Sequence, residues 1–187
     1  MTSDSIISIF LGIGLAASVG FRVFLPLFAL SLASYTGVWE LNESWEWIGS
    51  LASVITLGVA TLVEIFAYFV PFVDNLLDSF AVPLAAIAGT AVMVSTVADL
   101  DPVVTWSLAI IAGGGTATAI KGAGATGRIA STATTGGLAN PLVSTLETGT
   151  AVVVTTASIF APVLAVILVI IILVFIFRIY RKLRPKR

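Results

Sequence analysis

The sequence predicts an all-α fold, a polytopic integral membrane helical bundle in which residues 1–187 form a single transmembrane domain of about five to seven membrane segments. Apolar residues make up 58% of the chain, charged residues only 10%, and the mean hydropathy is +1.12. Soluble domains usually contain about 25% charged residues, so a water-soluble fold of this length would lack polar groups to cover its surface. The composition therefore excludes a soluble enzyme and a nucleic-acid-binding module, and predicts membrane lipids as partners.

The first segment, residues 5–36, is a long apolar run interrupted by Gly20, Arg22 and Pro26. A continuous helix of about 32 residues would be nearly 50 Å long, whereas the hydrocarbon core is roughly 30 Å thick. The excess length, with three interruptions near its centre, predicts a broken helix or a re-entrant helical hairpin.

The next elements are simpler. Residues 37–47 mix glutamates with tryptophans, which is typical of a loop at the membrane interface. Residues 48–70 and 79–98 are predicted to span the membrane. Residues 71–78 form a polar connector between them.

Residues 103–135 are the second unusual segment. They can span the membrane, but half of the sixteen glycines fall between Gly113 and Gly137. Irregular backbone at membrane depth is tolerated only when it is buried in protein or lines a wet cavity. We therefore predict a second Gly-interrupted element, preferably a hairpin and otherwise a single broken crossing. Two such elements favour a transporter.

Residues 149–177 are the most apolar stretch and are predicted as one span. The tail, residues 178–187, holds six of the nine basic residues, which predicts a cytoplasmic C-terminus. With an odd number of crossings, the N-terminus is then outside. The acidic Trp-rich loop is external if residues 5–36 form a hairpin and cytoplasmic if they cross once.

Ionisable residues at membrane depth are the candidates for function. Each costs about 2.5–3.5 kcal/mol at a helix centre, so each needs a partner or a water-filled cavity. We predict that five of them line a substrate or ion pathway: Arg22, Glu64, Lys121, Arg128 and Glu147.

Each of these residues has a functional and a structural interpretation. Arg22 would bind an anion at the helix break, or pair with Glu64 to hold helices together. Glu64 would carry a proton or cation, or reach the lipid headgroups. Lys121 and Arg128, within a Gly-, Thr- and Ser-rich stretch, would form an anion or phosphate cradle. Alternatively, Lys121 snorkels and the glycines only allow tight helix packing.

A possible cation or proton site is formed by Asp74, Asn75 and Asp78, because the two aspartates lie one helical turn apart. The alternative is a solvated connector that caps a helix. The ligands are too few to predict a metal. The chain has no His and no Cys, and we predict no catalytic residue and no cofactor.

The ordered residues resemble an uncharacterised prokaryotic membrane family, domain of unknown function 4126. The resemblance rests on the run Gly14–Pro26, on Glu64, and on a series of further positions: Pro71–Asp78, Pro83, Ala88-Gly89, Lys121, Arg128, Ser131-Thr132, Asn140–Ser144 and Glu147. It covers roughly residues 10–150 and implies a polytopic protein of the bacterial inner membrane, without naming a substrate.

One departure from the family stands out. An Asp-Lys pair is expected before the Pro71 motif, and Tyr68-Phe69 stands there instead. If that pair neutralises a partner in the family, the resemblance implies that Glu64 or Asp74 behaves differently in this chain.

The function predicted from the sequence is that of a small transporter or channel, not an enzyme. It would act on an anionic or phosphate-bearing solute, with buried basic residues at broken helices, and would form a homo-oligomer. The alternative is a non-transporting membrane scaffold or a protein that binds lipid headgroups, in which the buried charges are structural ion pairs.

Overall fold

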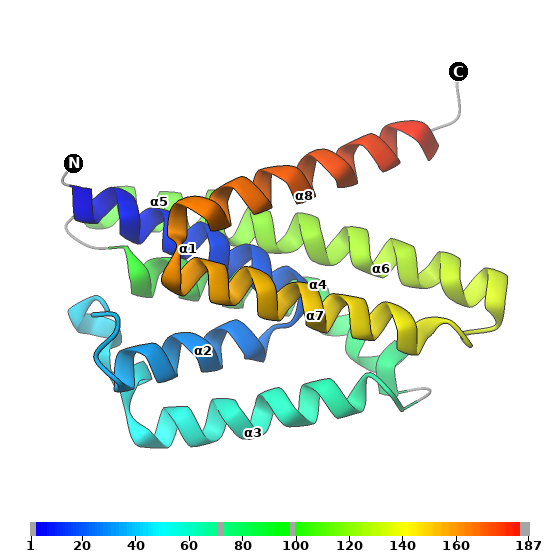
Figure 1. The fold of residues 1–187 in the computed structure, drawn as a ribbon, viewed down its shortest axis with the longest axis horizontal. Helices are drawn as coiled ribbons and strands as arrows, with labels where there is room; N and C mark the ends of the chain where they lie inside the picture. The colour runs from blue at the N-terminus through cyan, green and yellow to red at the C-terminus, as the bar shows by residue number, and fades with distance from the viewer. Residues whose placement is uncertain (1–2, 71–72, 98–99, 184–187) are drawn as a thin grey trace.

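The computed structural model describes residues 3–70, 73–97 and 100–183, which form helices and no strand (Figure 1). The elements are α1 (Ser3–Phe21), α2 (Phe24–Tyr35), the 3-10 helix η1 (Glu43–Gly49), α3 (Leu51–Ala67), α4 (Val73–Thr96), α5 (Pro102–Leu108), the π-helix η2 (Ala109–Gly114), α6 (Gly115–Thr135), α7 (Asn140–Phe160) and α8 (Pro162–Leu183). The basic tail lies in α8 up to residue 183, and its residues 184–187 lie outside the described chain.

The predicted break in the first segment is confirmed: α1 ends before Arg22, and α2 runs back beside it (Figure 1). The backbone N–H of Asn42, after α2, donates to the Ser95 carbonyl near the end of α4 (3.0 Å). Gly12 of α1 lies against Thr96 at the same level. The α1–α2 pair is therefore a hairpin whose two ends lie at one end of the bundle, called here the N-terminal end.

The opposite end, called the C-terminal end, holds the end of α3, the turn between α6 and α7, and the last turn of α8 (Figure 1). The turn of the α1–α2 hairpin does not reach it. Gly20 at this turn packs against Ile120 in the first third of α6. Side chains from α3, α4, α6 and α7 occupy the region between the hairpin turn and the C-terminal end.

The predicted second hairpin is wrong. Residues Pro102–Thr135 form a single candidate span in which α5, η2 and α6 follow one another without a reversal. The physical reason is that the glycines serve packing: a Cβ at Gly113 would lie 2.6 Å from the carbonyl oxygen of Gly89 in α4. Small residues allow such close approach of membrane helices, and the π-helix keeps the backbone bonded there.

The single span predicted for residues 149–177 is also wrong, because the chain turns back at Ala161. This residue lies outside the helical region (φ −148°, ψ 68°) and precedes Pro162. A residue before proline disfavours the helical region, and proline lacks the N–H that a continuing helix needs. Helices α7 and α8 are consequently two separate crossings.

Five of the described helical stretches are long and apolar enough to span a membrane: Ser3–Phe21, Leu76–Thr96, Pro102–Thr135, Asn140–Phe160 and Pro162–Lys182. Glu43–Gly49 with Leu51–Ala67, bent by 64°, is either a broken sixth span or a re-entrant loop. Helix α2 is apolar but shorter. The chain is thus a polytopic integral membrane protein.

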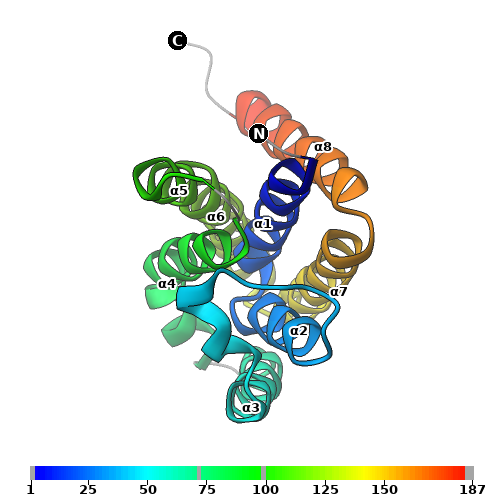
Figure 2. The same ribbon diagram turned by 90° about the vertical axis from the view of Figure 1, so that its left-hand side faces the viewer.

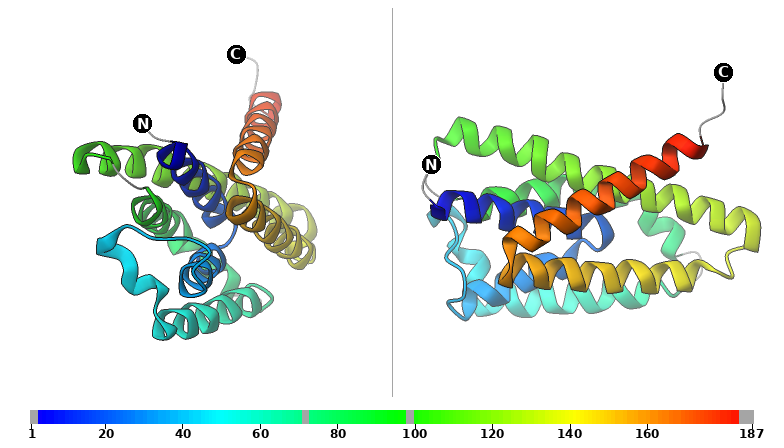
Figure 3. Two further views of the ribbon diagram at one scale, coloured as in Figure 1. Left: turned by 60° about the vertical axis from the view of Figure 1, so that its left-hand side comes forward. Right: turned by 45° about the horizontal axis from the view of Figure 1, so that its top comes forward.

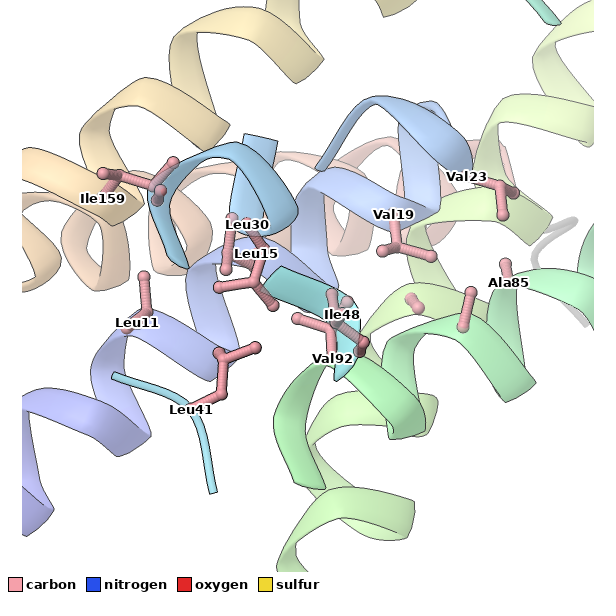
Figure 4. Close-up of a cluster of buried hydrophobic side chains, with 13 residues drawn as sticks. Leu11, Leu15, Val19, Val23, Leu30, Leu41, Ile48, Ala85, Val92 and Ile159 are labelled. Carbon is pink, nitrogen blue, oxygen red and sulfur yellow. The ribbon is translucent and has the colours of Figure 1, made fainter. Parts of the chain in front are cut away.

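Helix α1 is the centre of the bundle, enclosed by α2, α4, α6, α7 and α8 (Figure 2). Its buried Leu11, Leu15 and Val19 join a core with Leu30 of α2 and Val92 of α4 (Figure 4). Helix α8 instead leans away from the bundle toward its C-terminal end (Figure 3). The core therefore fixes the α1–α2 hairpin firmly, while α8 faces mainly lipid.

Candidate functional site

Glu64 of α3 caps the interrupted helix at the hairpin turn. A helix start leaves N–H groups without intrahelical partners. The carboxylate accepts hydrogen bonds from the backbone N–H groups of Val23 (Oε1, 2.8 Å) and Phe24 (Oε2, 3.0 Å). Negative charge at a helix N-terminus is also favourable. Glu64, which is only 7% exposed, therefore stabilises the start of α2.

Lys121 of α6 complements the other side of the break. Its Nζ donates to the carbonyl oxygen of Phe21, at the end of α1 (3.2 Å). A cation at a helix C-terminus is favourable for the same reason that an anion is at the start. The two broken helix ends are thus each met by a buried charge of the appropriate sign.

Arg22 lies at the turn itself and is fully buried. Its Nε donates to Thr148 Oγ1 and its Nη2 to the Ser144 carbonyl oxygen of α7, both at 2.9 Å. Its ion pair is with Glu147, at 3.8 Å from Nη1 to Oε2. The predicted structural partner was Glu64, and this interpretation is wrong, because Glu64 faces the backbone of Val23 and Phe24.

Arg128 of α6 contacts carboxylates of two other helices. Its Nη2 donates to Oε2 of Glu147 on α7, and its Nε lies 3.2 Å from Oδ2 of Asp78 on α4. One carboxylate oxygen of Glu147 thus faces the guanidinium groups of both Arg22 and Arg128. In the described chain, Nη1 of Arg22 and both Nε and Nη1 of Arg128 are buried without a hydrogen-bond partner.

Tyr68 also lies among these charged residues, and the sequence did not predict it as a site residue. It is 4% exposed, and its ring centroid lies 4.2 Å from Arg22 Cζ, 4.6 Å from Arg128 Cζ and 5.5 Å from Lys121 Nζ. A cation over an aromatic face is stabilised, more so when desolvated. Its hydroxyl also donates to Asp78 (3.3 Å). The available signal was the departure from the family pattern at this position.

These residues form one buried group, called here the charge cluster. Its members come from α3, α4, α6, α7 and the hairpin turn: Arg22, Glu64, Tyr68, Asp78, Lys121, Arg128 and Glu147. All five predicted pathway residues belong to it. Its three cations and three carboxylates balance formally, which lowers the cost of burying them.

The predicted cation site divides between two environments. Asp78 faces Arg128 and Tyr68 within the charge cluster. Asp74 accepts a hydrogen bond from Asn140 Nδ2 (3.3 Å), which also donates to Thr132 Oγ1 (3.1 Å). The side chain of Asn75 lies outside the described residues.

Two cavities reach the charge cluster from either side of α4. The first, of about 490 Å³, lies between α4 and α6 and is lined by Asp78, Ser79, Arg128, Thr132 and three apolar side chains of α6. It is called here the α4–α6 groove. The second, of about 380 Å³, is bounded by α2, α3 and α4; it is mostly apolar and reaches Glu64 and Tyr68.

The arrangement can bind an anion. Guanidinium groups present fork-shaped sets of donors that match phosphate and carboxylate oxygens, and here Nη1 of Arg128, which lines the groove, is buried without a hydrogen-bond partner among the described residues.

Comparison with known proteins identifies a family without a defined activity. The family described as "Domain of unknown function (DUF4126)" matches residues 9–182. No curated protein and no solved structure matches the chain.

Proposed function

Because the chain belongs to the family DUF4126, which has no defined activity, we propose a function from the geometry: it is a small transporter or channel for an anionic, phosphate-bearing solute. The α4–α6 groove admits the solute, and Arg128 and Arg22 bind it. Lys121 adds positive charge, while Glu64 and Glu147 partly balance the positive charge of the three basic residues.

The observation that carries this proposal is the surplus of buried donors beside the groove. Nη1 of Arg128 and Nη1 of Arg22 have no hydrogen-bond partner among the described residues, and Nε of Arg128 forms an ion pair with Asp78 (3.2 Å) without a hydrogen bond. A buried polar group without a partner costs about 1–3 kcal/mol, more when it is charged. Arg128 also lines the groove. An oxyanion entering there would offset this cost, because its oxygens accept several hydrogen bonds at once.

The second candidate is a non-transporting scaffold or a protein that binds lipid headgroups. It is favoured by the capping roles of Glu64 and Lys121, which are fulfilled without a bound solute. It is also favoured by Gly115 and Gly122, two turns apart on one face of α6, where an added Cβ would meet open space. Such a face suits helix packing against a second copy of the chain.

The basic residues at the end of α8 suggest the orientation. Arg178, Arg181 and Lys182 are exposed at the C-terminal end of the bundle. Basic flanks favour the cytoplasmic side, so we place this end in the cytoplasm of a bacterium, with the chain in its inner membrane. The acidic loop after α2 is then external, and the α4–α6 groove opens nearer the cytoplasm.

Phosphate flux into proteoliposomes tests the proposal. Arg128→Gln is expected to lower phosphate uptake at least tenfold, because the loss of a desolvated charged hydrogen bond costs 1.4 kcal/mol or more, about a factor of ten. Arg178→Gln is the matched control, since this arginine is exposed at the end of α8, and it should transport like the unmodified protein.

The outcome distinguishes the two candidates. Uptake is compared only for variants that are monodisperse and helical in detergent. Folded Arg128→Gln protein with unchanged uptake, or an unmodified protein with no uptake above empty liposomes, would contradict transport and support the scaffold.

A further inference from the structure

We propose that the Glu147 carboxylate is the resting occupant of the oxyanion site: it lies between Arg22 and Arg128 when no solute is bound, and a phosphate-class anion displaces it. The inference rests on the function proposed above and concerns the same site.

The first argument is the way in which one oxygen is shared. Glu147 Oε2 accepts a hydrogen bond from Arg128 Nη2 but lies 3.8 Å from Arg22 Nη1, which is beyond hydrogen-bond distance. The carboxylate therefore faces both guanidinium groups but bonds to one of them. A tetrahedral oxyanion carries more acceptor oxygens and can bond to both groups at once.

The second argument is the lack of other anchors for this carboxylate. In the described part of the chain, its hydrogen-bond and ion-pair contacts are with Arg22 and Arg128 alone. The carboxylate stands at the end of a flexible side chain that is 11% exposed. By contrast, Glu64 is held by two backbone N–H groups. Glu147 can thus move aside while Glu64 keeps the hairpin turn in place.

The third argument is Gly124 of α6. A Cβ at this position would lie 2.9 Å from Glu147 Oε1, although no backbone atom lies near it. The missing side chain leaves the room that the carboxylate occupies when it reaches Arg128. An alanine there would push the carboxylate out of the site without removing its charge.

An intramolecular occupant lowers the apparent affinity for solute by the fraction of time for which the site is open. If Glu147 occupies the site about nine-tenths of the time, removing it raises the apparent affinity about tenfold. A permanent structural partner would instead weaken the site when lost, and a gain that persists when the carboxylate is pushed aside with its charge kept distinguishes displacement from a charge effect.

Calorimetric titration of the purified, detergent-solubilised chain with inorganic phosphate tests the inference. We expect Glu147→Gln to bind phosphate about tenfold more tightly, and Gly124→Ala about threefold more tightly. Gly122→Ala is the matched control, because an added Cβ there meets nothing, and it should bind as the unmodified chain does. The gain in Gly124→Ala cannot come from altered net charge.

Each outcome decides something different. Tighter binding by Glu147→Gln alone shows a charge effect and overturns displacement, as does weaker binding by both variants. If Glu147→Gln does not fold, Gly124→Ala decides alone. Phosphate binding that is lost in Arg128→Gln keeps the proposed function even when displacement fails, whereas no binding by any folded variant overturns both.

A parallel titration with a short-chain phosphatidic acid identifies the source of the phosphate group. A gain in Gly124→Ala with inorganic phosphate assigns a free solute, and a gain with the lipid alone assigns a headgroup. Either gain supports displacement of Glu147.

Discussion

Replacing Glu64 by Ala is expected to destabilise the chain by about 3–5 kcal/mol, the usual cost of removing one member of a buried charged set. The carboxylate accepts hydrogen bonds from the backbone N–H groups of Val23 and Phe24 at the hairpin turn. Without it, two buried donors lose their partner, at about 1–3 kcal/mol for each. Arg22 and Lys121, which interact electrostatically with Glu64, also lose a compensating charge.

Unfolding in mixed micelles, with SDS as the denaturant and circular dichroism as the signal, measures this effect. Glu64→Gln should lie between Ala and the unmodified chain, because an amide keeps one acceptor oxygen. Glu40→Gln is the control, since Glu40 is exposed. Equal stability of Glu64→Ala and the control would show that the carboxylate does not hold the start of α2.

The second large effect is expected for Gly113→Ala. This substitution should destabilise the chain by about 3 kcal/mol, which is in the upper part of the usual range for overpacking. The added Cβ would lie 2.6 Å from the Gly89 carbonyl oxygen and 2.8 Å from Met93 Cβ. Because a backbone atom cannot turn away as a side chain can, α4 and η2 must separate.

The same unfolding assay, compared with Gly115→Ala, tests this packing. A Cβ at Gly115 meets nothing within 4 Å, and alanine favours a helix over glycine by about 1 kcal/mol. The control should therefore be as stable as the unmodified chain or more so. Equal behaviour of the two alanine variants would contradict the close approach of α4 and η2.

The sequence alone predicts the membrane class, the break at Arg22, and five of the seven residues that the structure brings together in the charge cluster; it does not place Tyr68 or Asp78 there. These predictions succeed because they rest on a cost that every membrane protein must meet: a buried charge needs a partner or water. Arg22 and Arg128 accordingly meet Glu147, whereas Lys121 meets the carbonyl oxygen of Phe21.

The pairing within the cluster could not be predicted. Whether Arg22 meets Glu64 or Glu147 depends on how α7 crosses α1, which no local pattern encodes. Glycines at 113 and 114 are equally compatible with a chain reversal and with close packing, and only the position of Gly89 in α4 decides. Likewise, Pro162 inside an apolar run is compatible both with a kink within one helix and with the start of a new helix.

Access of water to the α4–α6 groove is the most direct test of the central claim that the buried arginines serve a solute. The chain has no native cysteine, so Ala125→Cys, which lines the groove, provides a single thiol three residues before Arg128. Ile111→Cys, on the lipid-facing surface of η2, is the control. We expect a membrane-impermeant anionic thiol reagent to label Ala125→Cys and inorganic phosphate to slow that labelling. The central claim would be contradicted if the thiol at position 125 reacted no faster than the one at 111, or if phosphate did not protect it. Either result would show that the carboxylates of the cluster pair with the arginines and that no solute reaches them.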